Sequence, residues 1–244
     1  MGYPFKDVAH REYRNTFLKD VRVAVEFPAP SKKVEPERLR SFFGSFDGAQ
    51  VDVEEFLKNQ KIRVFSYDNK IDFHFEMGYA ELKICTPTYK TIEHSSGLWT
   101  LLADYLSALE VERINRLYVR KYSTFEFRIN QTDFDARMVM NTVFCKDLMD
   151  LMPKSKNNQR LTTIENTYSE SDEASRTSIR IVYGFKKSDT AEKPNHLTLV
   201  NLVASEDGPF PMNEYGERVL RYNKILFDAF HWCVRPDIIK AMDQ

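Results

Sequence analysis

Apolar and polar residues alternate along several stretches of the chain. Val21, Val23 and Val25 are separated by Arg22 and Ala24. A period of two is typical of a strand that buries one face. The same alternation, rich in β-branched and aromatic residues, predicts further strands at residues 62–64, 71–75, 80–84, 117–119, 161–167 and 179–185, and a last strand that begins near residue 197.

Between these strands the apolar period changes to that of an amphipathic helix. Five leucines and Tyr105 recur every three or four residues from position 98 to position 109. This spacing predicts a helix with one buried side, and Ser95 and Ser96 are its candidate caps. Further helices are expected at residues 36–46, 133–151 and 213–232, and Pro236 either kinks the last one or separates a final turn from it.

The order of these elements occurs twice. Residues 19–109 and residues 113–242 both read as strand, helix, three strands and helix. The pattern predicts an α+β protein of two pseudo-repeated β-α-β-β-β-α units, each an antiparallel sheet covered by a long helix, similar to helix-grip or TBP-like folds. We expect residues 1–110 and 111–244 to form the two units, packed closely as one body, since no long linker separates them.

The charges of the chain are balanced. The 35 Lys and Arg residues face 36 Asp and Glu residues, for a net charge of −1. Proteins that coat nucleic acid without specificity carry a clear basic excess, so this function is disfavoured, while a local basic patch stays open. No apolar run approaches the roughly 18 residues that cross a bilayer, so no membrane association is expected.

The three cysteines, Cys85, Cys145 and Cys233, lie far apart in the chain. They form no C-x-x-C pair and no Cys/His cluster with the spacing of a zinc site. Reduced thiols in a cytoplasmic protein are therefore expected, with neither a metal nor a cofactor. Residues 1–11 lack the apolar segment of a secretory signal.

Several segments together resemble one known family. They are residues 17–21 and 25–28, residues 114–122 (INRLYVRKY), residues 183–185 (YGF), residues 197–203, residues 227–230 (FDAF) and Met242. The chain is similar over nearly its whole length to the bacterial and archaeal "sporadically distributed" conserved hypothetical family. Its central strand departs from the family's R-x-G-L-R-Y pattern, because Arg116 to Val119 contains no glycine.

This resemblance implies little chemistry, since the family has no established activity. Its patchy distribution implies mobile genetic cargo, of which anti-phage defence is one common kind. That implication comes from association and not from any residue of the chain.

One predicted strand carries the strongest candidate site. Arg116, Tyr118, Arg120 and Tyr122 occupy every second position of this strand and should project from one face of a sheet. Arginine offers planar donors to phosphate, and tyrosine offers a ring for stacking, so a nucleotide, a nucleic-acid strand or an acidic peptide fits such a face. Arg113 and Lys121 are close in sequence, and Arg180 on a later strand completes the candidate set of Arg113, Arg116, Tyr118, Arg120, Tyr122 and Arg180.

A structural role is the alternative for these side chains. Carboxylates on neighbouring strands, such as Glu81, Glu76 or Asp72, could pair with the arginines and simply cover a solvated sheet. Such cross-strand charge pairs are common in antiparallel sheets.

Catalytic signals are weak throughout the chain. His74 lies between Asp72 and Glu76 on the polar side of its strand, and His94 precedes the two serines that are read as helix caps. No nucleophile elbow, phosphate-binding loop, dinucleotide fingerprint or zinc-protease motif is present. An enzyme of unfamiliar type would need His74 or His94 beside a carboxylate in a pocket.

The function expected from the sequence is therefore binding or regulation without catalysis, through the sheet or the cleft between the two units. A protein partner or a second copy of the chain is the expected ligand. Nucleic-acid or nucleotide binding through the Arg/Tyr face is the alternative.

Overall fold

The computed structural model of the chain describes most of its residues. The described ranges are 3–9, 11–13, 16–30, 35–44, 52–66, 71–85, 96–128, 136–152, 163–171, 176–187 and 195–243.

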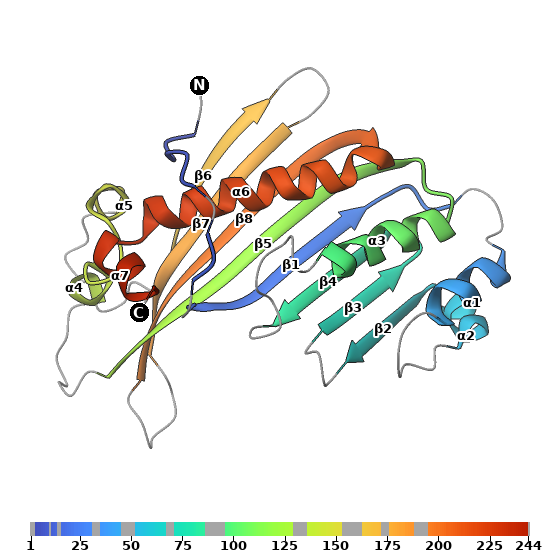
Figure 1. The fold of residues 1–244 in the computed structure, drawn as a ribbon, viewed down its shortest axis with the longest axis horizontal. Helices are drawn as coiled ribbons and strands as arrows, with labels where there is room; N and C mark the ends of the chain where they lie inside the picture. The colour runs from blue at the N-terminus through green and yellow to red at the C-terminus, as the bar shows by residue number, and fades with distance from the viewer. Residues whose placement is uncertain are drawn as a thin grey trace.

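The centre of the molecule is one sheet of eight strands in the order β2-β3-β4-β1-β5-β8-β7-β6 (Figure 1). Every neighbouring pair is antiparallel. The strands are β1 (Leu18–Glu26), β2 (Lys61–Ser66), β3 (Ile71–Glu76), β4 (Tyr79–Cys85), β5 (Arg113–Arg128), β6 (Thr163–Ser171), β7 (Arg176–Lys187) and β8 (Asn195–Pro211).

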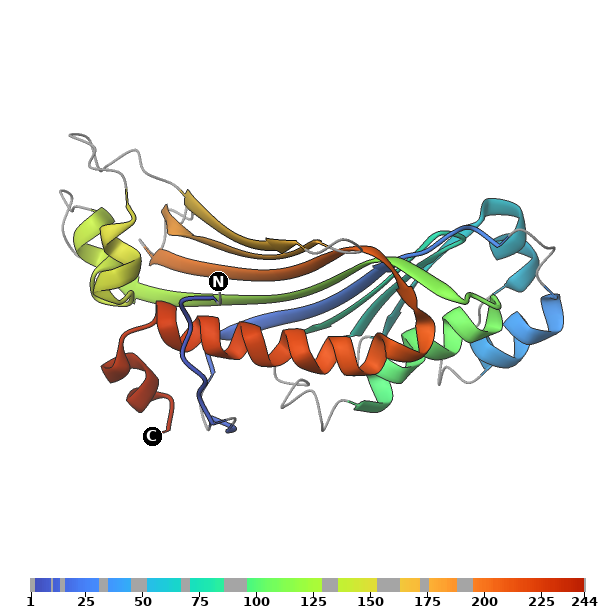
Figure 2. The ribbon, with the colours of Figure 1, turned by 90° about the horizontal axis from the view of Figure 1, so that it is seen from above.

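The two long helices lie on the same face of this sheet (Figures 1 and 2). α3 (Ser96–Ala108) crosses the part that contains β4, and α6 (Tyr215–Cys233) crosses β5 and β8. The shorter helices lie near the two ends of the sheet and are α1 (Pro36–Gly44), α2 (Val53–Asn59), α4 (Ala136–Met140), α5 (Lys146–Asp150) and α7 (Pro236–Ala241). In Figure 2 no described helix covers the middle of the opposite face, which we call the open face.

The period of two in each strand explains why the helices cover only one face. On β1, Val21, Val23 and Val25 are fully buried beneath the helices, while Arg22 between them points to the open face. Along α6 a matching apolar stripe, which includes Val219 and Leu226, packs onto the sheet. Burying these side chains removes apolar area from water and is the main stabilising contribution to the fold.

The prediction of two sheets, each covered by its own long helix, is wrong. β1 and β5 pair edge to edge, with Val23 opposite Val119, so the strands form one continuous sheet. Two separate sheets would each leave an additional row of backbone donors and acceptors unpaired at an edge, and this pairing satisfies them. The boundary expected at residues 110 and 111 falls in the turn between α3 and β5, and Glu110 there has a positive φ of 55°.

Several local predictions also change. A single helix was expected at residues 133–151, but the described part, from residue 136 onward, forms two short helices, α4 and α5, and α2 was not predicted. The segment 169–171, expected to begin an acidic loop, continues β6. Pro236 is the first residue of a separate helix, since Val234 before it is extended. Residues 161–162 and 172–175 and the candidate cap Ser95 lie outside the described residues, and Ser96, the other candidate cap, is the first residue of α3.

No helix among the described residues is long and apolar enough to span a membrane.

Candidate ligand-binding face

β5 carries the predicted Arg/Tyr face in the middle of the sheet. Arg116, Tyr118, Arg120 and Tyr122 all project to the open face, and all four are half-buried. Their common orientation follows from the strand period alone. The structure therefore brings these predicted residues together, but it gives the two arginines different surroundings.

Arg116 is neutralised by carboxylates on both neighbouring strands. Its Nε pairs with Asp207 on β8, and its Nη1 lies 3.5 Å from Oε1 of Glu26 on β1. The hydrogen bond to Asp207 raises the pKa of the Arg116 guanidinium above its ordinary value. Tyr118 joins the same group, since its hydroxyl donates to Glu26 at 3.2 Å. Arg116 thus forms cross-strand charge pairs of the kind that the alternative describes, with partners other than the three suggested by the sequence.

Arg120 has a neutral partner instead. Its Nε donates to Oδ1 of Asn201 at 2.8 Å, and its guanidinium carbon lies 5.4 Å from the centre of the Tyr122 ring. Within the described ranges no carboxylate forms an ion pair with Arg120. Its direct neighbour on β1 is Arg22, another cation.

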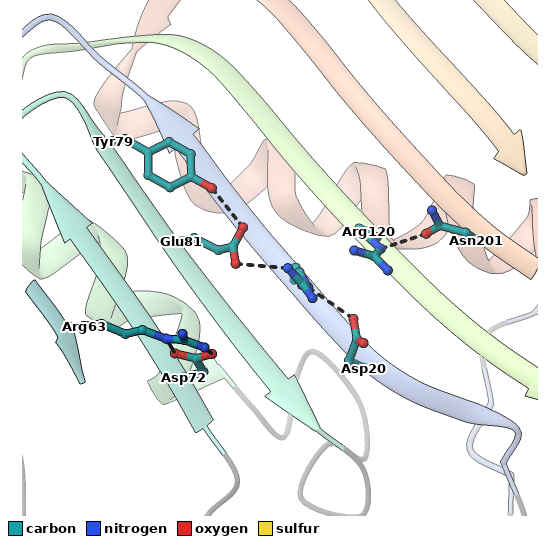
Figure 3. A network of polar contacts seen from close by, with 8 residues as sticks. Asp20, Arg63, Asp72, Tyr79, Glu81, Arg120 and Asn201 are labelled. Atoms are coloured by element: carbon teal, nitrogen blue, oxygen red, sulfur yellow. Dashed lines mark hydrogen bonds and ion pairs between the residues drawn. The ribbon is translucent and has the colours of Figure 1, made fainter. Parts of the chain in front are cut away.

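Arg22 extends this cationic group across β1. Its Nε lies 3.4 Å from Asp20, and its Nη1 lies 3.3 Å from Glu81 on β4. Both distances are long for charge-assisted hydrogen bonds, which are usually about 2.7–2.9 Å. Glu81 also accepts a hydrogen bond of 2.8 Å from the Tyr79 hydroxyl. Figure 3 shows this network, with α6 behind the strands.

Lys83 on β4 is the next neighbour of Arg22 in the register. Lys83, Arg22 and Arg120 therefore stand side by side on three adjacent strands, and we call them the basic row. Among the residues that the structure describes, Lys83 forms no ion pair. Asp72 stands directly opposite Lys83 on β3. Nε and Nη2 of Arg63 donate to its two carboxylate oxygens, and this hydrogen bonding lowers the pKa of Asp72.

Sequence reasoning missed Arg22 and Lys83. The alternation in the first strand already places Arg22 on its polar face. The sequence contains no signal for the pairing of β1 with β5, and this pairing is what brings Arg22 beside Arg120.

The two remaining predicted residues are not members of the basic row. Arg180 on β7 is exposed and lies 4.0 Å from Glu165, and it stands at the same register level as Arg120, with Val203 of β8 between them. Arg113 begins β5 and is exposed opposite Pro211, far along the strand from Arg120.

The histidine considered for catalysis has a carboxylate beside it, but in a solvated position. Nε2 of His74 lies 3.0 Å from Glu76, and the two side chains are 39% and 40% exposed. Such exposure is typical of a surface pair. His94 lies outside the described residues. The described ranges also contain no group of three or more His, Cys, Asp or Glu side chains that could hold a metal ion.

Comparison with known proteins does not indicate a function for this face. No protein-family model matches the chain, and no curated protein is similar to it in sequence. The resemblance described from the sequence therefore stays a prediction.

Proposed function

We propose that the chain is a non-enzymatic binding or regulatory protein whose partner lies on the open face. The observation that carries this proposal is a face that no described helix covers at its middle, with half-buried tyrosines and arginines at its centre. An antiparallel sheet can leave one face to water, so exposure alone is weak support. Tyrosine and arginine, however, are the side chains enriched where proteins bind partners.

The state of the charged groups favours binding over catalysis. Arg116 and Arg63 are held in ion pairs, and His74 meets Glu76 in an exposed position. General acid–base catalysis works best in a site that excludes water and shifts the pKa of its groups. A protein partner or a second copy of the chain fits a broad face of this kind.

The experiment compares one bulky substitution on each side of the molecule. Ser205→Tyr adds a ring to the middle of the open face on β8, and Glu217→Tyr adds the same ring to the exposed side of α6. Each tagged variant is expressed in the organism from which the chain comes and is purified in parallel with the tagged, unchanged chain. Components that co-purify in stoichiometric amount are identified by mass spectrometry and added back to the purified chain, and light scattering reports self-association.

The proposal requires that Ser205→Tyr loses the component, or the dimer, while Glu217→Tyr keeps it. Equal recovery with both variants would contradict binding on the open face. Circular dichroism of the two variants controls for folding. Nucleotide or nucleic-acid binding on the same face is the second candidate function, and the basic row favours it.

A further inference from the structure

The basic row concentrates positive charge at one level of the open face. Lys83, Arg22 and Arg120 occupy register positions on β4, β1 and β5 that are directly opposite one another. Neighbouring strands lie about 4.8 Å apart, so the three side chains begin within about 10 Å of each other. Like charges directly opposite each other in a sheet are destabilising, so the row carries an unfavourable interaction in the free protein.

The carboxylates near the row only partly offset this charge. Arg22 lies 3.3 Å from Glu81 and 3.4 Å from Asp20. Asp72 stands directly opposite Lys83 but is also hydrogen-bonded to Arg63. Glu81 also accepts from Tyr79, and the amide of Asn201 is the partner of Arg120. An anion placed over the row would gain donors from two guanidinium groups and one ammonium group. Phosphate suits them, since the planar donors of arginine match its oxygens.

An aromatic ring lies next to these cations. Tyr122 follows Arg120 on the same face of β5, and the guanidinium carbon of Arg120 lies 5.4 Å from its ring centre. Tyr122 stands opposite Asp20 on one side and Asn201 on the other, both short side chains. A nucleobase can stack on such a ring, and stacking on an aromatic side chain is tolerant of base identity.

The surrounding charges decide how much of a nucleic acid fits. Glu26 and Asp207 lie two rows along the strands from Arg120, and Asp72 lies beyond Lys83. A strand with many phosphates would pass over these carboxylates in at least one direction. One phosphate with one base avoids them, which favours a single nucleotide over a polymer.

We propose that the basic row binds the phosphate of a mononucleotide, whose base stacks on Tyr122. This inference rests on the proposed function, because it places the ligand on the same open face. It moves the centre of the site away from Arg113, Arg116 and Arg180 and toward two residues of the first half of the chain.

The experiment is isothermal titration calorimetry of the full chain with adenosine and uridine 5′-monophosphates. Arg120→Gln should weaken the affinity about tenfold or more, since a hydrogen bond to a charged group is lost. Arg116→Gln is the matched control, on the same strand and face, and should change the affinity less than about twofold. Tyr122→Leu should weaken nucleotide binding while leaving the weaker binding of inorganic phosphate unchanged. Circular dichroism and Arg120→Lys, which keeps the charge, check that any loss does not come from misfolding.

Three results would overturn the inference. The first is that neither monophosphate binds. The second is that Arg116→Gln and Arg120→Gln weaken the affinity for the nucleotide equally. The third is that decathymidylate binds more than about tenfold tighter than uridine monophosphate, which indicates a polyanion surface. A chain that binds no nucleotide but loses its co-purifying component through Ser205→Tyr would refute this inference alone. A chain that fails in both experiments would refute the proposed function as well.

Discussion

Each face of the sheet has a glutamate that contacts one arginine and one tyrosine, but the two glutamates differ in their exposure to water. On the helix-covered face, Glu206 pairs with Arg218 and accepts a hydrogen bond of 2.6 Å from the Tyr222 hydroxyl. On the open face, Glu81 lies 3.3 Å from Arg22 and accepts a hydrogen bond of 2.8 Å from Tyr79. The Glu206 side chain is 2% exposed and that of Glu81 is 25% exposed.

The difference shows that access to water determines how many charges the protein must pair by itself. Beneath α6 a charge must be matched by the protein itself, and Arg218 is accordingly shared between Glu206 and Glu214. On the open face water screens the charges, so three cations can stand side by side with few carboxylates. A charge imbalance is tolerated only where solvent or a ligand can compensate it.

The largest expected effect is on the covered face. Glu206→Ala leaves the buried hydroxyl of Tyr222 without its carboxylate and Arg218 with one partner fewer. We expect a loss of about 2–3 kcal/mol in the free energy of unfolding. Urea denaturation followed by circular dichroism measures it, with Glu217→Ala at an exposed position of α6 as control. A loss no larger than that of the control would contradict the comparison.

Tyr222, which bonds to Glu206 on the helix-covered face, should make the stability of the fold sensitive to alkaline pH. Burial, and then the hydrogen bond to Glu206, raises the pKa of Tyr222 above its ordinary value of 10.0. Because the folded state holds the phenol neutral, this stability is fully present below about pH 10 and is lost as the pH rises through the folded pKa.

Between pH 10 and pH 11 this one group contributes at most about 1.4 kcal/mol of loss. Tyr222→Phe removes that contribution, so its unfolding free energy should fall less steeply with pH than that of the unchanged chain. Identical slopes for the two proteins would show that Tyr222 ionises as easily when folded as when unfolded.

Glu81→Ala is the corresponding test on the open face, where Glu81 contacts Arg22 and Tyr79. Its partners stay accessible to water, so we expect a loss of about 1 kcal/mol or less, smaller than for Glu206→Ala. The loss should shrink further in high salt, because exposed ion pairs are screened. Urea denaturation at low and high ionic strength measures both effects, and a cost equal to that of Glu206→Ala would remove the distinction between the faces.

The smallest effect is expected within the basic row. Arg120→Gln relieves the repulsion from Arg22 opposite and keeps a side chain that can reach Asn201. The free energy of unfolding should stay unchanged or rise by about 0.2–1 kcal/mol. Arg116→Gln should lower it instead, since Arg116 has two carboxylate partners. A clear loss of stability with Arg120→Gln would mean that the row is structural.

The sequence predicted the content of individual strands well. The alternation around Val23 and the one around Arg120 both place side chains on the faces where the structure has them. It failed on α2 and on the single helix expected at residues 133–151, because the short helices and turns that the structure describes from residue 136 onward carry no sustained period. It also failed on the architecture, because an exposed strand edge and a paired strand edge have the same residue pattern.

The candidate site divides in the same way. The order of residues is enough to place Arg116, Tyr118, Arg120 and Tyr122 on one face, because side-chain direction in a strand is a local property of the backbone. The pairing of distant strands is what puts Asp207 beside Arg116 and Arg22 beside Arg120. Register and strand pairing come from backbone hydrogen bonds and burial between distant segments, and the order of residues within one strand does not specify them.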